Sequence, residues 1–272
     1  MDVTSPRREE LLNQALLTHW YENRASGRRL LQQLTSALEQ DLDQAFGYHM
    51  LVTGADMGLE FSRLGKTQRV FRLIDRATNS HGNDLVRGVS SELPFASDSL
   101  DVVVLCHTPD TSPLPHQVLR ECQRVLVPNG HLFIVGFNPV SLWGLGNRMG
   151  ALLSSRRRRL RAVGGRKLRD WLTLLGFSSS EPRYLSAVTP VGRGAVYRFL
   201  ERLDSWLVRH NFGGGSVYTL HGRKRVSQYI DTLSRVESRP RLISIPLGKT
   251  QGGVPVPRRV SRAVSGPLEP QP

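Results

Sequence analysis

The sequence lacks the features of a secreted or membrane-spanning protein. Its 272 residues include only two cysteines, Cys106 and Cys122, and both fall inside predicted apolar elements, where reduced core thiols are expected rather than a disulfide. No metal-ligand spacing is evident. No run of about eighteen apolar residues occurs, so a transmembrane helix is not expected. The amino terminus has no apolar signal-peptide core, and we therefore expect a cytoplasmic protein.

Acidic residues are scarce outside the first half of the chain. The net charge is +14, yet residues 1–138 carry 13 basic and 16 acidic side chains. Residues 139–170 carry nine basic and one acidic, and residues 222–272 carry ten and three. An anionic partner, either nucleic acid or a membrane surface, would therefore meet these segments, although a solvated surface run gives the same pattern. The candidate contacts in the insertion are Arg156, Arg157, Arg158, Arg159 and Arg161.

A strand, a helix and a second strand are predicted between residues 93 and 138. Residues 101–106 (DVVVLC) and 131–137 (HLFIVGF) are continuous apolar runs, as in strands buried on both faces. Residues 115–126 between them place their apolar side chains on one helical face, and Pro128-Asn129-Gly130 ends the helix. This order implies a right-handed crossover in a parallel sheet, whose ligand site lies at the carboxyl ends of the strands.

These residues also carry a family resemblance. LPF, SLDVVVLCH and LREC-RVLVPNGHL resemble the second half of class I S-adenosylmethionine-dependent methyltransferases, in particular the small-molecule branch of methyltransferase type 11 domains. The resemblance covers about residues 48–137, with a looser similarity over 167–177. It implies an α/β fold: a seven-stranded, mostly parallel Rossmann-like sheet with helices on both faces and an N-terminal helical cap. It also implies S-adenosyl-L-methionine as cofactor and a small-molecule methyl acceptor.

The chain divides into three predicted segments. Residues 1–46 form the helical cap, residues 47–225 the methyltransferase-like domain with a basic insertion at 139–166, and residues 226–272 a basic, Pro/Gly-rich tail that we expect to be disordered. Further strands are predicted at 48–53, 69–74, 84–88, 183–188 and 216–221, and further helices at 167–175 and 195–208. The strand at 216–221 resembles the antiparallel seventh strand that distinguishes methyltransferases from nucleotide dehydrogenases.

Two helices are predicted in the cap, separated at Ser26-Gly27. The expected apolar face of the first is Leu11, Leu12, Ala15, Leu16 and Trp20, and that of the second is Leu30, Leu31, Leu34, Leu38 and Leu42.

A glycine-containing loop follows the first predicted strand. In the family this loop has an acidic residue and three alternating glycines, because the backbone must approach the cofactor closely. Here Val52 stands at the acidic position, and Gly54, Asp56 and Gly58 stand at the glycine positions. Asp56 could accept the methionine ammonium of the cofactor. The alternative is an ordinary tight turn that binds no cofactor, because such a turn would show the same G-x-D-x-G pattern.

The ends of the second and third strands supply the other expected cofactor contacts. Asp75 ends the second strand, where a carboxylate can accept both ribose hydroxyls, or it simply begins a turn. Val89 stands where many relatives have an acidic residue that binds the adenine amino group. Adenine would then be bound by Ser90, Ser91 or Glu92, or by backbone groups.

His107, at the end of the fourth strand, is the first candidate for a catalytic base and also lines the expected cofactor cleft. A hydrogen-bonded histidine that caps the strand is the alternative. Asp110 and His116 are further candidates for a base.

Two other functions stay open at this point. A methyltransferase-like fold without catalysis could serve as a binding or scaffold module for an anionic partner. A nicotinamide enzyme is disfavoured because G-x-D-x-G is not the spaced dinucleotide fingerprint.

Overall fold

The computed structural model describes residues 6–23, 25–74, 82, 84–141, 161–185 and 215–225. All of them belong to one compact unit. Several predicted features lie outside the described residues. They are Asp75, the arginines at 156–159, the helix at 195–208 and the tail from 226.

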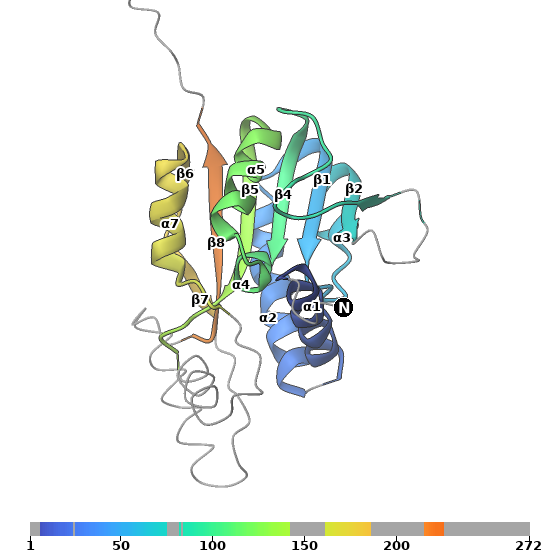
Figure 1. The fold of residues 1–272 in the computed structure, drawn as a ribbon, viewed down its shortest axis with the longest axis vertical. Helices are drawn as coiled ribbons and strands as arrows, with labels where there is room; N and C mark the ends of the chain where they lie inside the picture. The colour runs from blue at the N-terminus through green and yellow to red at the C-terminus, as the bar shows by residue number, and fades with distance from the viewer. Residues whose placement is uncertain are drawn as a thin grey trace, which may run out of the picture. The chain divides into compact units, whose positions relative to one another are not determined.

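The described strands form one eight-stranded sheet of order β3-β2-β1-β4-β5-β8-β6, with β7 also paired to β8. Neighbours among β1 to β5 are parallel, and β8 is antiparallel to β5, β6 and β7. In Figure 1 the arrowheads of β1 and β4 point toward α1 (Pro6–Asn23), while β8 runs the opposite way. This is the predicted Rossmann-like sheet with an antiparallel strand. The strands are β1 (Phe46–Gly54), β2 (Lys66–Ile74), β3 (Leu85–Arg87), β4 (Leu100–Cys106), β5 (Leu126–Phe137), β6 (Phe177–Ser179), β7 (Arg183–Leu185) and β8 (Val217–Lys224).

The sheet has one strand more than predicted because the expected sixth strand is divided. It was predicted at 183–188, yet pairing with β8 already begins at Phe177 and pauses between β6 and β7. Pro182 lies in this pause, and proline has no N–H to donate to a ladder. The antiparallel pairing of this divided strand with β8 is the arrangement that the family resemblance implied.

Helices cover both faces of the sheet. The described helices are α1 (Pro6–Asn23), α2 (Ala25–Leu42), α3 (Phe61–Leu64), α4 (Thr108–Thr111), α5 (Pro115–Val125) and α7 (Gly165–Leu174). One core cluster joins α1 and α2 to the sheet, and the other joins α5 and α7 to it. In β4 the alternation is clean, since Val102 and Val104 enter the first cluster and Val103 and Leu105 the second. Cys106 and Cys122 are free and buried, as predicted.

The turn between α1 and α2 falls near the predicted break. A Cβ at Gly27 would lie 2.3 Å from the carbonyl oxygen of Trp20, so glycine allows the two helices to approach each other. The predicted apolar face of α2 is confirmed: Leu30, Leu34, Leu38 and Leu42 are buried and Leu31 packs against them.

The predicted apolar face of α1 is wrong at Ala15 and Leu16, which are exposed, although Trp20 packs against the core as predicted. Leu16 is 56% exposed, whereas Glu10, Asn13, Leu17 and Tyr21 are buried. The helix is therefore rotated so that polar side chains face the molecule. The predicted start of β5 is also wrong, because the strand begins at Leu126 and includes the expected turn at Pro128-Asn129-Gly130. There the pairing of β4 with β5 shifts register, and Asn129 takes a positive φ of 67°.

Candidate functional site

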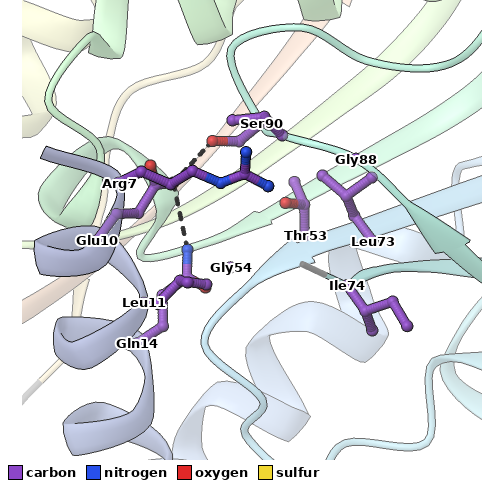
Figure 2. Close-up of a pocket in the computed structure, with 11 residues that line it drawn as sticks. Arg7, Glu10, Leu11, Gln14, Thr53, Gly54, Leu73, Ile74, Gly88 and Ser90 are labelled. Carbon is purple, nitrogen blue, oxygen red and sulfur yellow. Dashed lines mark hydrogen bonds between the residues drawn. The ribbon is translucent and has the colours of Figure 1, made fainter. Parts of the chain in front are cut away.

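The candidate site lies where the carboxyl ends of β1 and β2 and the loop after β3 meet helix α1. A pocket of about 30 Å³ occupies this position, and Figure 2 shows the side chains around it. Parallel sheets bind ligands at this edge because several strand ends and loops converge there. The lining residues are Arg7, Glu10, Leu11 and Gln14 from α1, Thr53 and Gly54 from β1, Leu73 and Ile74 from β2, and Gly88, Val89 and Ser90 after β3.

The loop after β1 contains two glycines with positive φ, for different reasons. Gly54 has φ +109°, and a Cβ there would lie 2.1 Å from the carbonyl oxygen of Cys106. Gly54 is thus required by the close approach of β1 to β4. Gly58 has φ +69°, but a Cβ there would meet no atom within 4 Å. Only its backbone conformation requires glycine, and open space lies on its Cα side.

Asp56 closes the loop between these glycines. Its Oδ1 accepts a hydrogen bond from the backbone N–H of Gly58 at 2.9 Å. Its Oδ2 accepts a hydrogen bond from Nη1 of Arg72, also at 2.9 Å. Arg72 also donates to the carbonyl oxygen of Leu59 at 2.9 Å. The Asp56 side chain is 57% exposed, so it stays accessible, but a cofactor ammonium would compete with Arg72 for it.

Ser90 and Ser91 form a turn after β3. Val89 and Glu92 pair across this turn, with the Glu92 N–H donating to the Val89 carbonyl at 3.0 Å. Ser90 is 4% exposed, and its hydroxyl donates to Oε1 of Glu10 at 2.8 Å. Ser91 is half-buried and Glu92 is exposed. Of the expected adenine contacts, Ser90 and the backbone at Val89 therefore line the pocket.

His107 is fully buried at the end of β4 and has a left-handed φ of 56°. Its Nδ1 lies 3.1 Å from Oδ2 of Asp110, and its Nε2 lies 2.7 Å from the Tyr21 hydroxyl. A carboxylate accepts only, so Nδ1 carries the proton and Nε2 accepts the Tyr21 O–H. The imidazole also stacks on Phe137 at 4.1 Å between ring centroids. Both ring nitrogens are therefore engaged, and the predicted base does not open onto the pocket.

Asp110 holds this cluster together. Its Oδ2 also accepts the Phe137 N–H at 2.8 Å, and its Oδ1 accepts the Val163 N–H at 3.1 Å. Burial raises the pKa of the Asp110 carboxyl, and the hydrogen bond from His107 opposes that shift. Burial also raises the pKa of the Tyr21 hydroxyl well above its ordinary value and that of the Cys106 thiol to about 12. Tyr21 and Cys106 are thus neutral in this site at physiological pH.

The comparisons with known proteins agree with the fold and the motifs. Residues 41–134 match the family model described as "Methyltransferase domain". The matched segment, which includes β1 to β4, is thus similar to a methyltransferase domain. The described sheet has the same fold as a SAM-dependent methyltransferase from Thermotoga maritima, with a TM-score of 0.54 and 16% identity over 80% of this chain and 98% of that one.

Two curated relatives match shorter stretches of the domain. The uncharacterized protein YafS of Escherichia coli (strain K12) is 33% identical over 149 residues, which are 52% of this chain. Phthiotriol/phenolphthiotriol dimycocerosates methyltransferase 1 of Mycobacterium ulcerans is 35% identical over 82 residues, or 30% of this chain. The chain spans 59% and 28% of the lengths of these relatives.

Sequence reasoning about the methyltransferase domain missed the contribution of α1. Glu10 and Tyr21 reach the candidate site from this helix and contact residues 80 and 86 positions away in the chain. The available signal was the helical spacing of Glu10, Asn13, Leu17 and Tyr21, which recur every three or four positions along α1.

The described part of the chain contains no cluster of three metal-ligating side chains. It also contains no helix long and apolar enough to cross a membrane. Arg161, the one described member of the predicted basic patch, is exposed and donates its backbone N–H to the Asp110 carbonyl.

Proposed function

We propose that this domain binds S-adenosylmethionine at the carboxyl ends of β1, β2 and β3 and transfers its methyl group to a small-molecule acceptor in the cytoplasm. The observation that carries the proposal is the loop from Gly54 to Gly58, which takes positive φ at both glycines and begins at the pocket, where Gly54 is part of the lining. The open space next to Gly58 lets a ligand approach the backbone where a side chain would otherwise stand.

The residues around the pocket fit a nucleoside with an amino acid side group. Hydroxyl groups of Ser90 and Ser91 and the backbone at Val89 can bind the adenine. Asp75 directly follows Ile74, which ends β2 and lines the pocket, so its carboxylate is our candidate for the ribose hydroxyls. Asp56 is the candidate to accept a hydrogen bond from the methionine ammonium of the cofactor, which would replace Arg72 as its partner.

When bound, the cofactor supplies an activated methyl group with a neutral leaving group, so the protein needs mainly to position the acceptor and exclude water. His107 remains the candidate base for an acceptor that must lose a proton. Because Nε2 accepts the Tyr21 hydroxyl, His107 would act on such an acceptor through Tyr21 or after Tyr21 moves away. Asp110 would hold its tautomer throughout.

Calorimetric titration of the full chain with S-adenosylmethionine and S-adenosylhomocysteine tests the proposal. We expect binding by the wild type and a loss of roughly ten- to hundred-fold in affinity for Asp75→Ala, which removes a charged hydrogen-bond acceptor. Gly58→Val should abolish binding while lowering stability by about 1–2 kcal/mol, the cost of left-handed backbone for a residue with a Cβ.

Denaturant midpoints of both variants provide the control for unfolding. If the wild type shows no affinity at about millimolar cofactor, which is already weak binding, the proposal is wrong. In that case Asp56 in place of glycine, and Val52 and Val89 in place of carboxylates, would mark a site that has lost its cofactor.

A further inference from the structure

Helix α1 forms one complete wall of the candidate pocket. In Figure 2 Arg7 and Glu10 extend from α1 across the pocket toward Ser90 and the end of β1. The remaining contributions of α1 to the lining are Leu11 and Gln14. The α1 wall does not belong to the sheet, so it can separate from the strand ends without breaking a strand pair.

A direct contact closes the pocket on the side of α1. Glu10 is 7% exposed, and its Oε1 accepts the Ser90 hydroxyl at 2.8 Å and Nε2 of Gln14 at 3.4 Å. Ser90 is itself buried in this contact. The hydrogen bond joins α1 to the loop after β3, a loop that carries the expected adenine contacts.

The closed pocket is too small for the proposed cofactor. Its volume is about 30 Å³, which is about the share of one water molecule in the liquid. Pockets for small organic ligands and cofactors measure about 300–1,000 Å³. The space that the described residues leave is therefore too small for a nucleoside while α1 is docked.

The two halves of α1 are held in different ways. Toward its carboxyl end, Leu17 and Tyr21 are buried in the core, and Tyr21 donates to His107. Toward its amino end, three of the four side chains that line the pocket are polar, Arg7, Glu10 and Gln14, and the fourth is Leu11. Between them Asn13 is buried, and its Oδ1 has no hydrogen-bond partner among the residues that the structure describes. A buried carbonyl without a donor destabilises the docked position of this half.

We propose that the amino-terminal half of α1 is a lid on the cofactor pocket, closed by the hydrogen bond between Glu10 and Ser90 and anchored at Tyr21. The proposal rests on the proposed function, since it assumes that the pocket admits S-adenosylmethionine. A closed lid lowers the apparent affinity by the fraction of molecules that are open. Weakening the closing contact should therefore tighten cofactor binding.

The test compares Glu10→Ala with Glu9→Ala in the full chain. Glu9 is the matched control because it precedes Glu10 in the same helical turn, carries the same charge and is exposed. Calorimetry and stopped-flow mixing with S-adenosylmethionine should show binding about tenfold tighter for Glu10→Ala, mainly through faster association, and no change for Glu9→Ala. Glu10→Gln, which keeps the shape of the side chain, should shift affinity in the same direction by less.

Either of two outcomes would overturn the lid. Weaker binding by Glu10→Ala and Glu10→Gln would make Glu10 a cofactor contact, and equal binding by all variants would show that α1 does not control entry. If Glu10→Ala fails to fold, the direction of the Glu10→Gln effect decides.

Hydrogen exchange without ligand separates the lid from the proposed function. We expect amides of residues 11–14 to exchange faster in Glu10→Ala than in Glu9→Ala, with amides near Tyr21 unchanged. If this difference appears but no variant binds S-adenosylmethionine, the proposed function is wrong and the lid stands. If the exchange of the two variants is the same, the lid is wrong whatever the cofactor does.

Discussion

Helices α1 and α2 are consecutive, have 18 residues each, and join the same core cluster, yet they bury different kinds of side chain. Helix α2 packs against β7 and β8 and buries leucines, whereas α1 packs against α4 and faces the pocket mainly with polar groups. The buried residues of α2 are Leu30, Leu34, Ala37, Leu38 and Leu42, and those of α1 are Glu10, Asn13, Leu17 and Tyr21.

The difference shows how one pair of helices serves two purposes. Apolar burial stabilises in proportion to area and needs no partner, so α2 fixes the hairpin to the sheet. The polar face of α1 depends on a few directed hydrogen bonds, each of modest net value. A helix held in this way can leave the pocket at lower cost than a helix held by leucines, which is what a lid requires.

The largest expected effect is on the α2 side. Leu34 is fully buried, so Leu34→Ala should lower the free energy of unfolding by about 2–5 kcal/mol through lost burial and a residual cavity. Leu16→Ala on the exposed side of α1 should change it by less than about 0.5 kcal/mol. Urea unfolding of both variants measures the difference. Equal losses would contradict the assignment of faces.

The second prediction concerns the anchor of α1. Tyr21→Phe removes the hydroxyl that donates to Nε2 of His107 and leaves a buried nitrogen without its partner, so we expect a loss of about 1–3 kcal/mol. Tyr48→Phe, at a tyrosine that is 63% exposed, is the matched control and should be nearly neutral. Chemical denaturation measures both. A neutral Tyr21→Phe would mean that the hydroxyl does not anchor the helix.

Much of the fold follows from the sequence because the central strands are buried on both faces. Residues 101–106 read as one apolar run, and β4 indeed lies between β1 and β5 with a core cluster on each side. The same holds for α2, whose leucines recur at helical spacing and whose apolar face was predicted. Both elements are determined mainly by which side chains are buried, and the spacing of apolar residues in the sequence predicts that burial.

The candidate site was less predictable because it depends on contacts between distant residues. The apolar side chains of α1 suggested a face that includes Leu16, but the docked helix turns Glu10 toward Ser90 instead. Local patterning has no information on a hydrogen bond between positions 10 and 90. The open space beside Gly58 and the pairing of Asp56 with Arg72 likewise depend on the folded loop.

The last prediction, and the smallest in effect, concerns acid. Phe133, in the same core cluster as α2, stacks on His221 at 4.6 Å between ring centroids, and His221 shares a hydrogen bond of 2.9 Å with His131. Burial is the main cause that lowers the pKa of His221 to about 4, and His131 and Arg223 add to it. The pKa of His131 is also lowered, by burial first and then by Arg223.

Because the folded protein keeps these imidazoles neutral, their contribution to stability is present above the unfolded pKa near 6.5 and is lost as the pH falls toward about 4. We expect a loss on the order of 1 kcal/mol across this window, since partial exposure reduces the full value of the shift. His221→Phe should flatten the dependence measured by urea unfolding between pH 7 and pH 4. The control is His19→Phe, at an exposed histidine of α1, which should leave the measured dependence as in the wild type. An unchanged slope in His221→Phe would show that this histidine pair does not cause the loss of stability in acid.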